Sequence, residues 1–341
     1  MNAGELEATA RAMVPSGKGI LAMDESNPSC AKRFKPVGIE CTEETRQAYR
    51  ELLLTTPGLS EFVSGAILFD ETIRQTLTDG TPFPVHMSRA GIIPGIKVDA
   101  GAKDLAGFPG EKVTEGLDGL RDRLAEYKEI GAQFTKWRAV ITIGDGIPTR
   151  GCMEINAHAL ARYAGLSQEA GLVPMVEPEV LINGDHTIGR CCEVTEETLR
   201  AVFSQLAAQR VRLEGVILKA SMVISGLDCP NRAGVKEVAA QTVRCLLNTV
   251  PPAVPGVVFL SGGQGNQEAT AHLNAMHSLG KDLPWALTFS YARALQQPAL
   301  EAWRGDVANV AAAQKAFYHR TKLNGAAALG RYNEKMEKEA A

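Results

Sequence analysis

Eight short apolar runs, separated by amphipathic segments, restrict the fold of this chain more than any other feature of its sequence. Uninterrupted apolar runs are typical of strands buried on both faces of a parallel sheet. The amphipathic segments between them are typical of connecting helices. The predicted strands lie at 19–23, 64–69, 94–98, 137–143, 173–176, 215–218, 256–260 and 285–289.

Strands that alternate with helices predict right-handed βα crossovers and a parallel sheet. Eight strands are the number that closes a (β/α)8 TIM barrel, whose active site lies at the C-terminal ends of the strands. The length of 341 residues suits one such domain with extra segments. We therefore expect a single barrel domain over 1–341, in which residues from about 325 to 341 form a surface helix or loose tail.

Several segments carry the signals of helix starts. The sequence TEET at 42–45 has capping chemistry, and leucines at 117, 120 and 124 have helical spacing. We also expect one helix to begin near 195 and run to about 209, and another to begin at 267.

Composition limits the partners and the compartment. The formal net charge of −3 argues against nucleic acid or an acidic membrane surface as the main partner. No apolar run approaches the roughly 20 residues of a membrane span, and the first residues lack the features of a signal peptide. The seven cysteines include no C-x-x-C pair, which favours reduced thiols and a cytoplasmic protein.

Polar or ionisable side chains mark nearly every predicted strand end. One or two would mean little, because any strand must reach solvent somewhere. In a barrel, however, these ends meet at one face, so their convergence predicts a shared site. The candidates are Asp24, Ser26, Lys97, Lys136, Arg138, Glu177, Glu179, Lys219, Ser261, Gly262, Gly263, Ser290 and Arg293.

Each candidate also has a purely structural interpretation. Lys219 could extend its ammonium to solvent at the barrel mouth. Glu177 and Glu179 could be solvated carboxylates on a loop, and Asp24 could cap a helix. The segment 261–263 could be only a tight turn, although a glycine-rich loop after strand seven and a cation after strand eight are the common phosphate seat of this fold.

A lysine between two apolar runs favours imine chemistry. In EGVILKASMVISG, residues 214–226, Lys219 separates two such runs. Apolar surroundings and a nearby cation help an ammonium to lose its proton, and the neutral amine can attack a ketone to form a Schiff base. The protonated imine accepts electrons when a nearby C–C bond breaks, while carboxylates move protons. Cations on two sides of the site suit a substrate with two phosphates. One side would have either Lys97 or the pair Lys32 and Arg33, and the other side would have Arg293.

Six motifs, in order along the chain, resemble those of class I fructose-1,6-bisphosphate aldolases. They are LAMDES (21–26), KWRAV (136–140), VEPEVL (176–181), ILKASMV (217–223), FLSGGQ (259–264) and WALTFSYARALQ (285–296). The resemblance implies a plant-like or bacterial enzyme that reversibly cleaves fructose 1,6-bisphosphate to dihydroxyacetone phosphate and glyceraldehyde 3-phosphate. It further implies a lysine Schiff base with no metal or other cofactor, sugar phosphates as the ligands, and a homotetramer in the cytoplasm or, for a plant protein, the plastid stroma.

The resemblance also implies a role for each matched residue. Lys219 is then the Schiff-base nucleophile, Glu177 the general acid and base, and Asp24 the group that orients a substrate hydroxyl and assists C3–C4 cleavage. Lys136 favours the neutral form of Lys219, and Glu179 supports this charge network. Arg138 and Lys97 contact polar groups of the substrate. The C1 phosphate is seated by Ser261, Gly262, Gly263 and Arg293, with Ser290 beside them, and the C6 phosphate lies near Ser26, Ser29, Lys32 and Arg33.

Three positions depart from the pattern of the family. The nucleophilic lysine is usually followed by Pro-Asn, whereas here Ala220 and Ser221 follow it. A glycine before the phosphate-binding arginine is replaced by Ala292, which keeps its backbone N–H and is tolerated where φ is negative. Animal members end in a tyrosine that assists proton transfer at C3, and Tyr332 is the nearest tyrosine to the end of this chain.

Three alternatives remain open at this point. A metal-dependent aldolase needs a histidine cluster, but the six histidines show no tight ligand motif. A non-catalytic barrel would not need Asp24, Glu177 and Lys219 together. A transaldolase-type enzyme, or a related aldolase acting on another sugar phosphate such as sedoheptulose 1,7-bisphosphate, would also use a lysine imine.

Borohydride reduction in the presence of dihydroxyacetone phosphate should attach the substrate covalently to Lys219, because borohydride reduces an imine to a stable amine. Peptide mapping locates the adduct. Absence of a reducible adduct on Lys219 would contradict the imine mechanism, and loss of activity in EDTA would favour the metal-dependent alternative.

Overall fold

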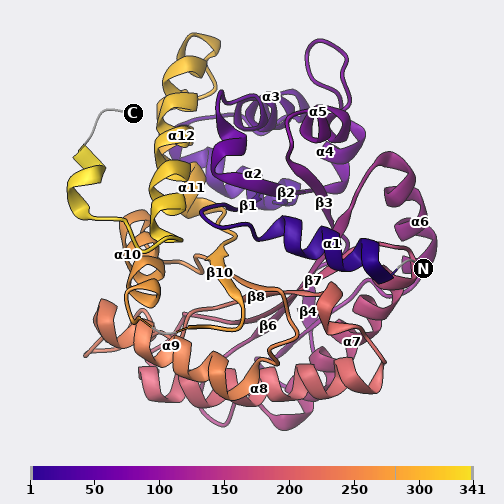
Figure 1. The fold of residues 1–341 in the computed structure, drawn as a ribbon, viewed down its shortest axis with the longest axis vertical. Helices are drawn as coiled ribbons and strands as arrows, with labels where there is room; N and C mark the ends of the chain where they lie inside the picture. Colours follow the sequence, from indigo (N-terminus) through magenta and orange to yellow (C-terminus); the bar gives the residue numbers. More distant parts are fainter. Residues whose placement is uncertain (1–2, 281, 339–341) are drawn as a thin grey trace.

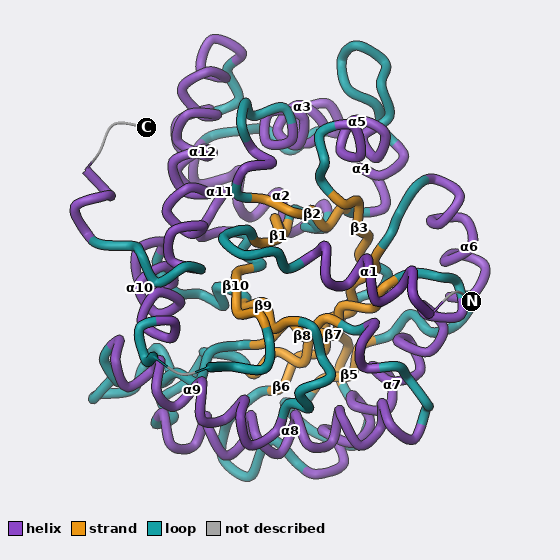
Figure 2. The backbone as a smooth tube through the Cα atoms, in the orientation of Figure 1, coloured by secondary structure: helices purple, strands orange, loops and turns teal. Residues whose placement is uncertain are grey.

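The computed structural model describes residues 3–280 and 282–338 and confirms the (β/α)8 barrel (Figure 2). Eight parallel strands follow one another around the sheet in chain order. The first and last strands approach each other, because the Ala22 N–H donates to the Tyr291 carbonyl at 3.0 Å. The barrel strands are β1 Gly19–Ala22, β2 Val63–Leu68, β3 Ile93–Lys97, β6 Phe134–Ile141, β7 Val173–Val180, β8 Ile217–Ala220, β9 Gly256–Phe259 and β10 Ala286–Phe289. Two short strands, β4 Ala102–Asp104 and β5 Lys112–Thr114, form a separate antiparallel pair.

All eight predicted strands are present; five differ from the predicted bounds by one residue at one or both ends, and three differ by more. Strand β6 begins three residues earlier than predicted, β7 continues four residues further, and β8 is displaced by two residues. Successive strand residues point to opposite faces, so a polar residue that points into the barrel interrupts the apolar run without ending the strand. Four predicted site residues therefore lie within strands rather than after them: Lys136, Glu177, Glu179 and Lys219.

Helices surround the barrel (Figure 1). The α-helices are α1 Ala3–Met13, α2 Asn27–Phe34, α3 Glu43–Leu54, α4 Asp70–Arg74, α5 Phe83–Arg89, α6 Leu120–Ile130, α7 Arg150–Glu169, α8 Ile188–Ala208, α9 Val235–Thr249, α10 Asn266–His277, α11 Arg293–Trp303 and α12 Val310–Ala327. Short 3-10 helices lie at η1 Lys35–Val37, η2 Leu59–Glu61, η3 Leu213–Gly215, η4 Val307–Asn309 and η5 Glu334–Lys338. No helix among the described residues is long and apolar enough to cross a membrane.

The predicted helix starts were partly right. The cap of α3 is confirmed, because the Thr42 hydroxyl accepts from the Thr45 N–H at 3.2 Å. The prediction of a helix start near 195 was wrong, since α8 already begins at Ile188 with Thr187 as its cap. Its first turns are held by the buried side chains of Cys191 and Val194, which have helical spacing.

One end of the barrel is closed by α1, which crosses the ring of strands in Figure 1. Its buried residues Leu6, Ala10 and Met13 pack with inward-facing strand residues such as Phe134 and Ile217 in one apolar cluster. This cluster lies at the N-terminal ends of the strands. The open cavity is therefore confined to the opposite end, where the predicted site residues lie.

The last described segment is fixed to the barrel by an ion pair. Arg320 on α12 is buried, and its guanidinium donates to both carboxylate oxygens of Glu337 at 2.7 and 2.6 Å. Tyr332 donates to the same carboxylate at 2.9 Å and does not line the cavity. The final Lys338-Glu339-Ala340-Ala341 of the sequence falls largely outside the described residues.

Gly95→Ala should lower the midpoint of urea unfolding, because an added Cβ would lie 2.1 Å from the Phe134 ring inside the barrel. Overpacking of this kind typically costs about 1–3 kcal/mol. Gly189→Ala on α8 is the control, since its Cβ would make only ordinary contacts, the nearest at 3.7 Å. An unchanged midpoint for Gly95→Ala would show that Phe134 moves without cost.

Candidate active site

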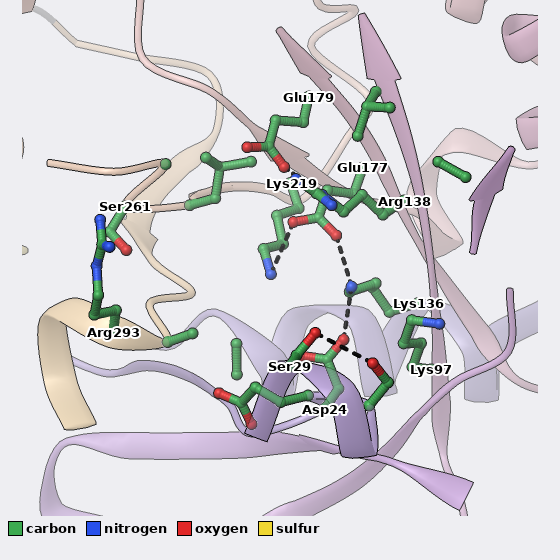
Figure 3. A pocket seen from close by; sticks show the side chains of 18 of the residues that line it. Asp24, Ser29, Lys97, Lys136, Arg138, Glu177, Glu179, Lys219, Ser261 and Arg293 are labelled. Atoms are coloured by element: carbon green, nitrogen blue, oxygen red, sulfur yellow. Dashed lines mark hydrogen bonds and ion pairs between the residues drawn. The ribbon is translucent and has the colours of Figure 1, made fainter. Parts of the chain in front are cut away.

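A cavity of about 1010 Å³ opens at the C-terminal ends of the strands (Figure 3). All sixteen site residues predicted from the sequence line it, including the segment with Ser26, Ser29, Lys32 and Arg33. The barrel therefore brings together residues from positions 24 to 293.

Strand periodicity points the ionisable groups of β6 and β7 into this cavity. Lys136 and Arg138 are two residues apart on β6, so they share one face, and Glu177 and Glu179 do the same on β7. The intervening Trp137 is fully buried on the opposite face, where its ring stacks on Tyr163 of α7 at 5.5 Å between centroids. The parallel register sets Arg138 beside Glu177.

Four ionisable side chains form a continuous chain across the cavity (Figure 3). The Lys136 ammonium lies 2.7 Å from Asp24 and 2.9 Å from one oxygen of Glu177. The other oxygen of Glu177 lies 3.0 Å from the Lys219 nitrogen. All four are buried. The interpretation of Glu177 and Glu179 as solvated loop carboxylates is therefore wrong, as is that of Lys219 as a lysine that reaches solvent.

Lys136 controls the charge state of both carboxylates. Burial by itself would raise the pKa of Asp24, but the charges of Lys136 and Lys219 and the hydrogen bond from Lys136 hold it well below its usual range. Burial would also raise the pKa of Glu177, but the positive charges of Lys136, Lys219 and Arg138 outweigh this effect and lower it. Burial would lower the pKa of Lys136, whereas the negative charges of Asp24 and Glu177 raise it. Lys136 is therefore a permanent cation between two carboxylates.

Two other predicted cations are paired with carboxylates at the rim. Arg138 forms an ion pair with Glu179, and Lys97 lies 2.7 Å from Asp99. Asp99 was missed by the sequence analysis, although it follows Lys97 by two residues and its carboxylate also accepts from the Arg138 N–H at 3.2 Å. A carboxylate just beyond a strand-end lysine was the signal that could have found it.

Arg33 is held by residues that the sequence analysis did not select. It forms an ion pair with Glu25 and donates to the Gln296 side chain at 3.3 Å. Gln296 is buried and in turn donates to Glu25 at 3.1 Å and to the Ala22 carbonyl at 2.6 Å. The last residue of the WALTFSYARALQ motif therefore connects α11 to the loop after β1, which only the closure of the barrel brings into contact.

A further part of the cavity wall is formed by the loop after β9, Ser290 and Arg293. It combines backbone N–H groups, a hydroxyl and a cation. Gly262 and Gly263 have φ values of 50° and 95°, which favour glycine. A Cβ on Gly263 would lie 3.8 Å from the Arg293 guanidinium, so the loop after β9 lies beside the start of α11. The buried Ser290 hydroxyl has no hydrogen-bond partner among the described residues. Ala292 has φ −104°, outside the left-handed region that favours glycine.

The residues that follow Lys219, Ala220 and Ser221, are also accommodated. Ala220 is buried at the end of β8, and the Ser221 hydroxyl donates to the Val180 carbonyl of β7 at 3.0 Å. The Ser221 side chain therefore joins the segment after β8 to the end of β7 by a hydrogen bond.

The family model of class I fructose-bisphosphate aldolase matches residues 5–341. The chain belongs to the class I fructose-bisphosphate aldolase family. Among curated proteins, it is 63% identical to a probable fructose-bisphosphate aldolase class 1 of Xanthomonas campestris, covering 97% of this chain and 99% of that protein. It is 50% identical to the chloroplastic fructose-bisphosphate aldolase 1 of Chlamydomonas reinhardtii, covering 99% of this chain and 89% of the relative.

A solved structure of this aldolase family has the same fold. It is the Plasmodium falciparum fructose-bisphosphate aldolase in complex with TRAP and a small-molecule inhibitor, at 47% identity and a TM-score of 0.95. The match covers 97% of this chain and 95% of that one. Family membership establishes the enzyme as a class I aldolase. It therefore favours imine chemistry over the metal-dependent and non-catalytic alternatives.

Lys136→Met should destabilise the enzyme most at neutral pH, because it removes the paired cation of buried Asp24 and one of the two cations beside buried Glu177. Loss of one partner of a buried ion pair typically costs about 3–5 kcal/mol. In the wild type, Asp24 and Glu177 have lowered pKa values, so their stabilisation is present above the unfolded-state pKa and is lost as pH falls. In the variant the carboxylates gain protons more readily on acidification.

Urea unfolding at pH 7 and pH 5 checks this prediction: the difference between wild type and Lys136→Met should narrow at the lower pH. Lys236→Met, at an exposed position on α9, is the control and should change little at either pH. A difference that grows on acidification would contradict this account of the ion pairs.

Proposed function

We propose that this enzyme cleaves fructose 1,6-bisphosphate reversibly through a Schiff base on Lys219. The activity is that of the family to which the chain belongs. The assignment to Lys219 rests on one observation, the contact of its buried nitrogen with Glu177 at 3.0 Å in a chain that continues to Lys136 and Asp24. At this distance Glu177 is placed to accept the proton that Lys219 must lose before its nitrogen can attack a carbonyl.

Glu177 is proposed to move the protons of imine formation. The amine of Lys219 attacks the C2 carbonyl, and the resulting carbinolamine loses its hydroxyl as water after Glu177 donates a proton to it. When Glu177 itself holds a proton, Lys136 keeps Asp24 as its counter-ion at 2.7 Å. The shared cation therefore prevents either protonation state of Glu177 from leaving an unpaired charge in the buried site.

Asp24 is proposed to assist the cleavage step. Its lowered pKa keeps it a carboxylate, which accepts a hydrogen bond from the C4 hydroxyl and favours loss of the hydroxyl proton. As the C3–C4 bond breaks, its electron pair enters the imine to give an enamine, and the aldehyde product leaves. Protonation of the enamine at C3 and hydrolysis of the imine then release dihydroxyacetone phosphate and restore Lys219.

Two anion seats on opposite sides of Lys219 support a substrate with two phosphates. The C1 seat combines Ser261, Gly262, Gly263, Ser290 and Arg293, and the Ser290 hydroxyl, which has no hydrogen-bond partner in the described part of the chain, offers a donor there. The C6 seat combines Ser26, which precedes α2, with Ser29, Lys32 and Arg33 on that helix, and Lys97 and Arg138 are proposed to contact the sugar hydroxyls. Arg33 contacts Glu25 and Gln296 through one guanidinium nitrogen, Nη1, so its other N–H groups are proposed to donate to the second phosphate.

Assembly and compartment follow from the resemblance. We propose a homotetramer in the cytoplasm that uses no metal or other cofactor in catalysis, with sugar phosphates as its ligands. The chain's relatives include cytosolic and chloroplastic aldolases, so a plastid location is the alternative for a plant source.

Glu177→Gln should lower kcat by about 10²–10⁴-fold, the usual contribution of a general acid or base, with a smaller change in KM. The amide keeps the size of the side chain but can neither accept nor release the proton. Steady-state cleavage of fructose 1,6-bisphosphate measures the effect. Glu237→Gln, at an exposed position on α9, should retain wild-type kcat. A Glu177→Gln enzyme with kcat within threefold of wild type would assign proton transfer to another group.

A further inference from the structure

A second group of candidate ligands lies outside the barrel, where α8 and α9 pack together (Figure 1). Cys192 and Glu196 are one turn apart on α8, and Cys245 lies across from them on α9. One ligand atom from each residue lies within 4.8 Å of the other two. None of the three lines the cavity at the strand ends, so the group is separate from the catalytic site.

The three side chains form a donor set suited to a thiophilic cation. Two cysteine sulfurs and a carboxylate oxygen are ligands that Zn²⁺ accepts in tetrahedral sites. The i, i+4 spacing places the Cys192 sulfur 3.9 Å from a Glu196 oxygen on one helix face. Cys192 and Glu196 are partly exposed while Cys245 is buried, so a bound ion would retain a solvent-facing position.

Glu196 is already oriented and charged in the absence of an ion. Asn248 of α9 donates to one carboxylate oxygen at 2.9 Å, and Arg200 lies 2.5 Å from the other. The hydrogen bond from Asn248 lowers the pKa of Glu196, although burial opposes it. Outer hydrogen bonds that fix a ligating carboxylate are a regular feature of metal sites.

The two thiols are poorly suited to be reactive nucleophiles. Burial raises the pKa of Cys192 and of Cys245, so both are protonated thiols near neutral pH. A thiophilic cation displaces the thiol protons when it binds, because the thiolate is the ligand. Neighbouring Cys191 is engaged elsewhere, because its sulfur accepts from the Ile224 N–H at 3.5 Å.

We propose that Cys192, Glu196 and Cys245 bind one thiophilic divalent cation, with Zn²⁺ as the probe, and that this ion joins α8 to α9. The site goes beyond the catalytic function and does not depend on it. Since the ion binds only the folded arrangement of both helices, it stabilises the enzyme by mass action. The adjacent Cys191–Ile224 contact belongs to the loop after β8, so the joined helices also support the segment that follows Lys219.

The test is titration of the reduced, metal-free, full-length enzyme with Zn²⁺ by calorimetry, and with Co²⁺ by absorption. One ion per chain and a thiolate-to-cobalt charge-transfer band are expected. Cys192→Ser and Glu196→Gln should each weaken binding by about tenfold or more, since even outer-shell changes cost about 10–100-fold. Cys191→Ser is the matched control: it changes the adjacent thiol and should retain wild-type affinity.

Zn²⁺ should also raise the thermal midpoint of the wild type and of Cys191→Ser, but not that of Cys192→Ser. Because Cys192 and Glu196 are partly exposed, their variants test the site even if replacement of buried Cys245 prevents folding. Absence of the charge-transfer band in the wild type, or equal affinity in the Cys192→Ser variant, would overturn the proposal. EDTA should lower the thermal midpoint of the zinc-loaded enzyme without lowering aldolase turnover, which keeps this test distinct from that of the catalytic mechanism.

Discussion

The position of Lys136 between Asp24 and Glu177 is the interaction on which the rest of the site depends. A buried ammonium is costly unless it is paired, and each of the two buried carboxylates has the same requirement. One cation, at 2.7 and 2.9 Å from the two carboxylates, meets both needs at once. Glu177 can then use its second oxygen for the Lys219 nitrogen.

The barrel is what makes this pairing possible. Asp24 follows β1, Lys136 lies on β6 and Glu177 lies on β7, so the three groups come from separate parts of the ring. A slip of one residue in β6 would point Lys136 toward the helices and Trp137 into the cavity. The stacking of Trp137 on Tyr163 of α7 therefore helps to fix the register that directs Lys136 inward.

Much of the fold and site was accessible from local patterns. The apolar runs predicted eight strands because core residues of a parallel sheet must be apolar on both faces, and all sixteen predicted site residues line one cavity. The bounds of β6, β7 and β8 were less accessible, since inward-facing Lys, Arg and Glu residues end an apolar run without ending a strand. The early start of α8 was missed because its first turns mix buried apolar with charged residues.

The sequence alone determined the number and order of the barrel strands, and the types of side chain at their ends, because these depend on local hydrophobicity and residue chemistry. Only the tertiary structure decided which side chains contact one another. It pairs Lys97 with Asp99, Arg33 with Glu25 and Gln296, and Cys192 with Cys245 across two helices. Such pairings depend on barrel closure, register and helix packing, which act between distant segments and leave no local pattern. Lys219 was visible from the start as a lysine between apolar runs, but its contact with Glu177 exists only once β7 and β8 lie side by side.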